Sequence, residues 1–277
     1  MDRYAVIGNP VAHSKSPLIH AAFARQTGQK LSYEALLAPL DGFAATVMEF
    51  RRAGGRGMNV TVPFKLEAHA LATALSARAQ AAGAVNTLEF RPDGTVFGDN
   101  TDGAGLVRDL TDNLACPLSG RAVLLLGAGG AARGALLPLL RRSPSRLAVA
   151  NRTAERAEDL ARRFAAEAGG CVLSACGYPA LAGEAFDVVI NATSASLSDE
   201  APLLPPGLYA PGALAYDMMY GKGDTPFLAA ARADGAARLA DGLGMLVEQA
   251  AESFQLWRGL RPDTAPVLAA LREGRSP

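Results

Sequence analysis

Several residue types are scarce in this sequence, and each scarcity excludes a class of protein. Only three of the 277 residues are cysteines, an odd number without the Cys-x-x-Cys spacing of zinc or redox sites. We therefore expect no disulfide framework, and a reducing compartment. Three histidines are also too scattered along the chain to predict a metal site, and we expect no bound metal; they are His13, His20 and His69.

An excess of either charge is also missing. The 27 basic and 27 acidic residues balance, so nothing suggests a nucleic acid or an anionic membrane as a partner. No apolar run approaches the length of a membrane span, and Met1 to Gly8 lead directly into a strand pattern without a basic leader. We expect a cytoplasmic protein with one large domain or two ordinary domains.

The most informative stretch of the chain runs from Arg121 to Arg156. Ala122 to Leu126 form a short apolar run that is typical of a strand buried on both faces, and the run ends at a glycine-rich turn. A helical pattern follows from Ala132 to Arg142, and a second apolar strand from Arg146 to Ala150. This order predicts a βαβ unit.

The turn of this unit matches the dinucleotide-binding pattern Gly-x-Gly-x-x-Gly/Ala, with Gly127, Gly129 and Ala132 at its three positions. Gly127 allows the tight turn, and Gly129 lets the backbone approach a pyrophosphate. The helix that follows presents unpaired N–H groups to the anion. A glycine-rich turn can also be purely structural, but the flanking strand and helix favour nucleotide binding.

The end of the second strand indicates which dinucleotide is bound. A carboxylate at this point accepts a hydrogen bond from the ribose 2′-hydroxyl of NAD. Here the strand leads into Asn151-Arg152-Thr153, and Arg156 follows one turn later. Two guanidinium groups without a carboxylate suit a 2′-phosphate, so we expect NADP.

Two serines lie before the first helix. The strand from Tyr4 to Gly8 is followed by Ser14-Lys15-Ser16-Pro17, and proline after serine is typical of a helix start. The pattern predicts Ser16 as the N-cap. Ser14 adds a second hydroxyl that could help to hold a small carboxylate, although capping alone would explain most such sequences.

A third segment places polar groups beside a lysine. Asn59 and Thr61 alternate with valines and are expected on one face of an extended segment. Pro63 is expected to begin a helix with Lys65 in its first turn, where the helix dipole disfavours a cation. Because only four lysines occur in the chain, Lys65 hints at a need for a group that can release a proton.

The remaining patterns are less specific. Asn86 could be a turn residue, and Asp102 could simply cap a helix that reaches Leu114. Further strands are predicted at Phe186 to Ile190 and around Leu214 to Tyr216, with a Pro-rich loop at Ala201 to Pro211 between them. Apolar residues from Leu243 to Trp257 recur at helical spacing and predict a buried helix face.

Taken together, these motifs resemble those of the shikimate dehydrogenase family. They occur in the family's order along nearly the whole chain. The matching segments are Gly8-Asn9-Pro10 with His13-Ser14-Lys15-Ser16-Pro17, Asn59 to Lys65, Gly83 to Thr87, Gly98 to Gly103, Gly127 to Ala131, Asn151 to Thr153, Asn191 to Ser194, Tyr216 to Met218 with Tyr220, and Asp241 to Val247 with Gln249.

The resemblance implies an α/β protein with two domains. Residues 1–101 would form an α/β domain that binds substrate, and residues 102–242 a Rossmann-type, doubly wound NADP-binding domain. The helices of residues 243–277 would return to pack on the first domain. The implied reaction is the reversible NADPH-dependent reduction of 3-dehydroshikimate to shikimate, a step in chorismate and aromatic amino acid biosynthesis.

The resemblance also assigns roles to individual residues. Lys65 and Asp102 would be the catalytic pair that transfers the proton, since hydride addition to a ketone leaves an alkoxide that needs a donor. Substrate would be bound by Ser14 and Ser16 at its carboxylate, and elsewhere by Asn59, Thr61, Lys65, Asn86, Asp102, Tyr220 and Gln249. The cofactor would contact Gly127, Ala128, Gly129, Gly130, Ala131, Asn151, Arg152, Thr153, Arg156, Asn191, Thr193, Met218 and Gly242.

Some positions depart from the family, and two other functions stay open. Ala77 stands where many relatives carry an acidic residue, and Gly221 and Asp224 replace larger or neutral residues. The alternatives are a quinate or shikimate dehydrogenase that prefers NAD, and a non-catalytic regulator that senses NADP or shikimate. A sensor would need no proton-transfer pair, so Lys65 with Asp102 disfavours it. We expect a monomer or a homodimer.

Overall fold

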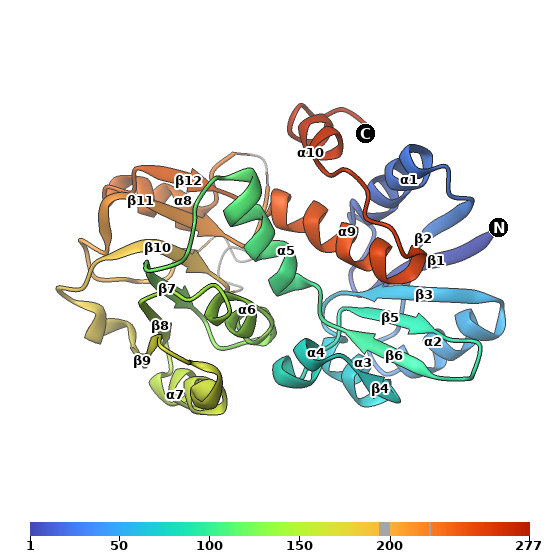
Figure 1. The fold of residues 1–277 in the computed structure, drawn as a ribbon, viewed down its shortest axis with the longest axis horizontal. Coiled ribbons are helices and arrows are strands. Elements are labelled where there is room, and N and C mark those ends of the chain that lie inside the picture. The colour runs from blue at the N-terminus through green and yellow to red at the C-terminus, as the bar shows by residue number, and fades with distance from the viewer. Residues whose placement is uncertain (194–199, 222) are drawn as a thin grey trace. The chain divides into compact units, whose positions relative to one another are not determined.

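The computed structural model describes residues 1–193, 200–221 and 223–277, which contain two six-stranded sheets (Figure 1). The chain divides into two compact units. The first unit comprises Met1–Gly105 and Leu246–Pro277, and the second comprises Leu106–Met245. Both divisions fall within helices, α5 (Asp102–Arg108) and α9 (Leu243–Arg258).

The sheet of the first unit is mixed. Its strands, in the order β2-β1-β3-β5-β6-β4, are β1 (Asp2–Gly8), β2 (Leu31–Leu37), β3 (Gly55–Val60), β4 (Ala74–Leu75), β5 (Thr87–Phe90) and β6 (Val96–Asp99). β1 runs parallel to β2 and β3, whereas β5 is antiparallel to β3 and β6. Besides parts of α5 and α9, the first unit contains the helices α1 (Ser16–Thr27), α2 (Phe43–Arg52), α3 (Lys65–Leu71), α4 (Ala77–Ala82) and α10 (Ala265–Arg272).

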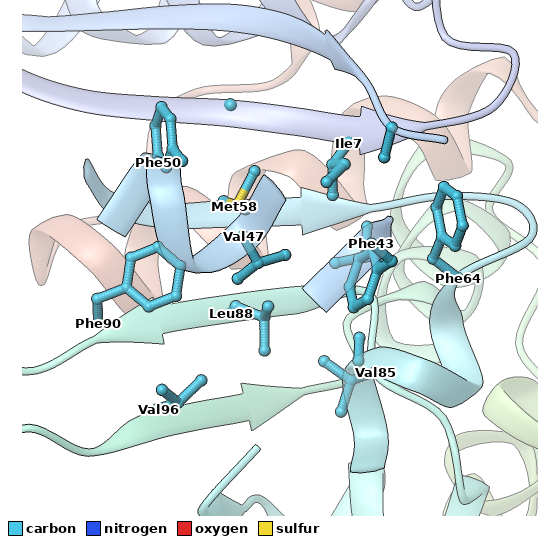
Figure 2. Close-up of a cluster of buried hydrophobic side chains, with 14 of the residues drawn as sticks. Ile7, Phe43, Val47, Phe50, Met58, Phe64, Val85, Leu88, Phe90 and Val96 are labelled. Atoms are coloured by element: carbon cyan, nitrogen blue, oxygen red, sulfur yellow. The ribbon is translucent and has the colours of Figure 1, made fainter. Parts of the chain in front are cut away.

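One apolar cluster fixes this sheet (Figure 2). Helix α2 buries Phe43, Val47 and Phe50, which the spacing of four and three residues places on one helix face. They pack with side chains of β3 and β5, including Met58 and Leu88, neither of which is exposed. Close packing of this kind leaves the strand ends little freedom to move, so the side chains that follow those ends are held in defined positions.

The second unit contains a fully parallel sheet. Its strands, in the order β12-β11-β10-β7-β8-β9, are β7 (Ala122–Leu126), β8 (Arg146–Asn151), β9 (Val172–Gly177), β10 (Phe186–Asn191), β11 (Tyr209–Asp217) and β12 (Arg238–Ala240). The strand succession reverses between β7 and β10, as in a doubly wound Rossmann fold. This confirms the predicted fold class.

Helices of the second unit include α6 (Gly130–Leu140), α7 (Ala154–Phe164) and α8 (Pro226–Ala233). Short 3₁₀ turns lie at Ala165–Glu167 and Tyr178–Leu181, and a π-helical turn at Asp109–Asn113 continues α5. Among the described residues, no helix is both long enough and apolar enough to cross a membrane.

Several element boundaries differ from those predicted, and three of the differences have a clear local cause or extend into a predicted loop. Helix α6 begins at Gly130, two residues earlier than expected, because Gly129 already has the extended backbone of an N-cap. Helix α3 begins at Lys65 rather than Pro63, since the Phe64 N–H closes a turn on the Thr61 carbonyl at 3.1 Å. Strand β11 starts at Tyr209, inside the segment predicted as a loop.

Candidate active site

The polar residues predicted in the first unit gather at one edge of its sheet. In the strand register Ile7 pairs with Val60, Asn59 with Thr87, and Thr87 with Asp99. The ends of β1, β3 and β6 therefore lie together with the start of β5. The segments that leave this edge carry the predicted residues Ser14, Ser16, Thr61, Lys65, Asn86 and Asp102.

Lys65 and Asp102 form an ion pair at this edge. The Lys65 Nζ donates to Asp102 Oδ2 at 2.6 Å, and the two side chains are 24% and 11% exposed. They are the first residues of α3 and α5, so backbone elements fix both Cα positions. Within the described residues the Lys65 ammonium has no second partner, which leaves two of its three N–H donors for another molecule.

Asn86 holds the second oxygen of the same carboxylate. Its Nδ2 donates to Asp102 Oδ1 at 2.8 Å, while its Oδ1 accepts from the Thr101 backbone N–H at 2.8 Å. A backbone N–H can only donate, so this contact fixes which end of the Asn86 amide faces Asp102. Both oxygens of Asp102 thus accept hydrogen bonds, one from Asn86 and one from Lys65.

Arg78 and Asp99 brace the segment that leads to Asp102. The Arg78 guanidinium binds the Asp99 carboxylate through two hydrogen bonds of 2.7 and 2.6 Å, and Asp99 Oδ1 accepts from the Asn100 N–H at 2.7 Å. Burial alone would raise the pKa of Asp99, but the contacts with Arg78 outweigh it and hold this pKa below its usual range. The pair thereby stabilises the turn from β6 into α5.

Gln249 of α9 joins the same group of side chains. Its Oε1 lies 3.4 Å from both Asn86 Nδ2 and Thr101 Oγ1, and its Nε2 donates to the Leu246 carbonyl at 2.8 Å. Gly105 permits α9 to approach α5 this closely, since a Cβ on residue 105 would lie 2.6 Å from the backbone nitrogen of Gln249. The predicted helix face is buried at Val247, Ala250 and Phe254, whereas Leu246 and Trp257 are only half-buried.

Asn59 and Thr61 differ in their surroundings. Asn59 is 6% exposed, and its amide bonds to Tyr33, Ser253 and Thr87 within the protein. Thr61 lies one residue beyond the end of β3 and is half-buried. It packs against Gly8, and a Cβ on residue 8 would lie 2.3 Å from the Thr61 methyl group.

The predicted role of Ser16 as N-cap is wrong. Helix α1 begins at Ser16, and the capping position belongs to Lys15, whose backbone is helical and whose side chain makes no capping bond. Instead, Ser14 Oγ accepts from the Ser16 N–H at 3.2 Å, as in a serine turn, and Ser16 is 5% exposed. Ser14 and Ser16 therefore lie together, with Ser14 serving the helix start.

The second unit gathers its predicted residues at the carboxyl ends of parallel strands. Gly127 follows β7 with a φ of 106°, and a Cβ at this position would lie 3.1 Å from the Ala192 carbonyl oxygen. Gly129 and Gly130 are exposed, with nothing within 4 Å of where a Cβ would stand. The start of α6 is thus an open backbone surface without a side-chain cap, which fits a phosphate group. The neighbouring Ala128 is buried and Ala131 half-buried.

The end of β8 is basic. Arg152 and Arg156 are exposed, and neither forms an ion pair within the described part of the chain. Asn151 Nδ2 donates to the Thr153 carbonyl at 2.9 Å, which shapes the turn into α7. Two unneutralised guanidinium groups beside the glycine turn fit the 2′-phosphate of NADP.

The ends of β10 and β11 are tied together. Asn191 Nδ2 donates to Asp217 Oδ1 at 3.1 Å, and Asn191 Oδ1 accepts from the Thr193 hydroxyl at 2.7 Å. Gly242 packs against the backbone of Met218. A Cβ on residue 242 would lie 2.2 Å from the Met218 carbonyl oxygen. Ser194, which belongs to the predicted motif, lies outside the described residues.

Tyr220, and the three positions that depart from the family pattern, make fewer contacts than the residues above; these positions are Ala77, Gly221 and Asp224. Tyr220 is half-buried, and burial, with a smaller effect of the Asp241 carboxylate, raises its pKa. Asp224 pairs with Arg232 at 2.6 Å, while Ala77 and Gly221 are exposed. Among the described residues no group of three His, Cys, Asp or Glu side chains could hold a metal ion.

Comparison with known proteins identifies the family. Residues 6–88 match the substrate-binding domain of shikimate dehydrogenase, residues 109–198 the shikimate/quinate 5-dehydrogenase family, and residues 242–272 the shikimate 5′-dehydrogenase C-terminal domain. The chain is 71% identical to the shikimate dehydrogenase (NADP(+)) of Aromatoleum aromaticum over 98% of its own length and 97% of that protein. The chain belongs to the shikimate dehydrogenase family.

Solved structures agree with this membership. A shikimate 5-dehydrogenase from Thermus thermophilus, in complex with NADP(H) and shikimate, superposes with a TM-score of 0.85 at 36% identity, covering 99% of each chain. An Ael1 enzyme from Pseudomonas putida gives a TM-score of 0.90 at 54% identity, covering 98% of each chain. The family resemblance predicted from the motifs is confirmed.

The structure also adds residues to which the family resemblance assigned no role, two of which, Thr87 and Thr101, lie within the matching segments. Tyr33, Thr87, Thr101 and Ser253 all hydrogen-bond to predicted site residues. One signal for Ser253 was available in the sequence. It follows Gln249 by four residues and interrupts an apolar helix face, so helical spacing alone places it beside Gln249.

Proposed function

We propose that this chain catalyses the reversible NADPH-dependent reduction of the C3 ketone of 3-dehydroshikimate to shikimate, a step in the biosynthesis of chorismate and the aromatic amino acids. The observation that carries the proposal is the Lys65–Asp102 pair, set among amides and hydroxyls at one sheet edge. The first unit binds the substrate, and the second unit binds NADP.

The residues of the second unit fit NADP. Gly127 to Ala131 hold the pyrophosphate at the start of α6, and Arg152 and Arg156 hold the 2′-phosphate beside Asn151 and Thr153. Asn191, Thr193, Met218 and Gly242 lie at or beside the carboxyl ends of the same sheet and would hold the nicotinamide end of the cofactor. When bound, NADPH supplies the hydride that reduces the ketone.

Lys65 supplies the proton. As the carbonyl carbon is reduced, charge develops on its oxygen, and the Lys65 ammonium donates a proton to that atom. Asp102 orients the ammonium through the 2.6 Å hydrogen bond and is itself held by Asn86. In the oxidative direction the neutral lysine accepts the proton of the shikimate hydroxyl.

The remaining polar residues orient the ring. Ser14 and Ser16 hold the ring carboxylate at the start of α1, where the helix N-terminus also favours an anion. Within the first unit, Thr61, Asn86 and Gln249 bind the hydroxyl side. These groups donate and accept hydrogen bonds at fixed positions, which is the basis of selection among polyhydroxylated substrates.

The second candidate is a quinate or shikimate dehydrogenase that prefers NAD. Its quinate part is supported by the matched family, whose description names quinate as well as shikimate. A purely regulatory role is disfavoured by the Lys65–Asp102 pair, since a sensor needs no proton donor. We infer a cytoplasmic location from the three free cysteines, and a monomer or homodimer stays a prediction.

The experiment that tests the proposal crosses shikimate and quinate with NADP and NAD. Reduced nicotinamide is followed by its absorbance. The highest kcat/KM is expected for shikimate with NADP. An enzyme that prefers quinate with NAD would support the second candidate, and no reduction of either nucleotide would exclude both.

A further inference from the structure

A group of buried hydroxyls lies behind the proposed substrate site. Thr87, Thr101 and Ser253 are completely buried, and the Ser253 oxygen lies 2.9 Å from Thr87 Oγ1 and 3.3 Å from Thr101 Oγ1. Thr87 begins β5, whereas Ser253 lies on α9, far away in the sequence. A buried hydroxyl without a hydrogen-bond partner would lower the stability of the fold, so each of these hydroxyls is expected to have a partner.

The bonding pattern runs in one direction. Asn86 Oδ1 can only accept, so the Thr87 hydroxyl at 2.9 Å donates its single proton there. Thr87 Oγ1 is then an acceptor towards Asn59 Nδ2 at 3.1 Å. The Ser253 proton has three acceptors within reach, Thr87 Oγ1 at 2.9 Å, the Gln249 carbonyl oxygen at 3.1 Å and Thr101 Oγ1 at 3.3 Å.

Asn59 belongs to the same chain of hydrogen bonds. Its Oδ1 accepts from the Tyr33 hydroxyl at 2.7 Å, and its Nδ2 donates to Ser253 Oγ at 2.9 Å as well as to Thr87. These contacts use both N–H groups and one lone pair of the amide. Asn59 therefore faces the hydroxyls, whereas the family resemblance assigns it to the substrate.

We propose that Thr87 and Ser253 are positioning residues of the reaction, which act through Asn86. The Thr87 hydroxyl binds the Asn86 Oδ1 directly, and Ser253 and Asn59 bind the Thr87 oxygen in turn. Together they hold the Asn86 Oδ1 in place beside the Thr101 N–H, so that the opposite end of the amide is aimed at Asp102. Donors point from Asn59 towards the carboxylate throughout, and aligned hydrogen bonds of this kind polarise one another. The inference rests on the proposed function, since it concerns the residue that holds the catalytic carboxylate.

The test removes one hydroxyl without changing the shape of the side chain. Thr87→Val is nearly isosteric and suits a strand, and Thr87→Ser keeps the hydroxyl. The matched control is Thr46→Val on α2, a half-buried residue whose hydroxyl donates only to the Gly42 carbonyl of its own helix at 2.9 Å. Each variant is assayed with shikimate and NADP well below its melting temperature.

We expect Thr87→Val to lower kcat about tenfold while the KM for NADP stays unchanged, and Thr87→Ser to stay within about twofold of the wild type. Ser253→Ala should lower kcat in the same way. Because the two hydroxyls act on one amide, the double variant should lose less than the product of the two single losses. A merely structural role would lower the melting temperature and leave kcat unchanged.

A second measurement separates this inference from the proposed function. In ¹⁵N NMR spectra the side-chain NH₂ signals of Asn86 should shift in Thr87→Val and not in Thr46→Val. Shifted signals in a protein that does not oxidise shikimate would keep the positioning role and reject the function. An active wild type with unchanged kcat and unchanged Asn86 signals in Thr87→Val would overturn the inference.

Discussion

The buried ring of His20 makes the stability of the protein depend on pH, independently of the proposed catalysis. Its ring is fully buried, stacks on Tyr33 at a centroid distance of 4.2 Å, and has no hydrogen-bond partner for either nitrogen among the described residues. Burial lowers the pKa of His20 to about 3. The folded protein therefore keeps this ring neutral at pH values where the unfolded chain protonates it.

The size of the effect follows from linkage. Because the folded pKa is below the ordinary value of 6.5, the unfolded state binds more protons as pH falls, and the free energy of unfolding decreases. With these two values the loss between pH 7 and pH 5 is about 2 kcal/mol, and it reaches about 5 kcal/mol below both pKa values. His20→Phe keeps an aromatic ring against Tyr33 and removes this loss.

Urea unfolding at pH 7 and pH 5 measures the difference. Trp257 is the only tryptophan, and its ring centroid lies 5.5 Å from that of His20, so its fluorescence reports on this part of the first unit. The fall in unfolding free energy between the two pH values should be about 2 kcal/mol smaller in His20→Phe than in the wild type. His13→Asn, at an exposed histidine, is the control and should behave like the wild type. Equal pH dependence in His20→Phe and the wild type would show that His20 does not cause this loss of stability.

Three further predictions concern the proposed site. Lys65→Ala should fold and bind shikimate with a near-normal Kd while kcat drops by roughly 10² to 10⁴, and turnover within a few-fold of wild type would remove the lysine from the mechanism. Replacing Arg152 and Arg156 together by alanine should raise the KM for NADP far more than that for NAD, and an unchanged preference would contradict the 2′-phosphate assignment. Ser14→Ala should lower stability by about 0.5 to 2 kcal/mol through the lost bond to the Ser16 N–H, as seen by thermal melting, and should also raise the KM for shikimate. Ser16→Ala should raise that KM without the capping loss, and a KM unaffected by either change would argue against carboxylate binding.

Much of the second unit could be predicted because its signals are local. A five-residue apolar run, a glycine turn and an apolar helix specify a βαβ unit within one short stretch, and β7 has the predicted bounds from Ala122 to Leu126. The basic end of β8 is likewise a matter of adjacent residues. Such signals depend on backbone sterics and hydrophobic burial over a few residues, which one sequence contains in full.

The parts that could not be predicted depend on distant partners or on one backbone angle. Ser16 failed as an N-cap because Lys15 adopts a helical backbone, a choice that the Ser-x-Ser-Pro pattern does not determine. The contact of Asn59 with Ser253 joins residues 194 positions apart, so no local pattern could indicate it. The ion pair of Lys65 with Asp102 was expected only through the family resemblance, since α3 and α5 meet through tertiary packing.

The division of the chain within α5 and α9 has a consequence for synthesis on the ribosome. Strands β1 to β6 are made first, then the whole second unit, and Leu246–Pro277 only at the end. A nascent chain can therefore complete the parallel sheet while the first unit still lacks Gln249 and Ser253. The substrate site is finished last, and a chain interrupted shortly before Gln249 would retain every strand of both sheets without a complete site.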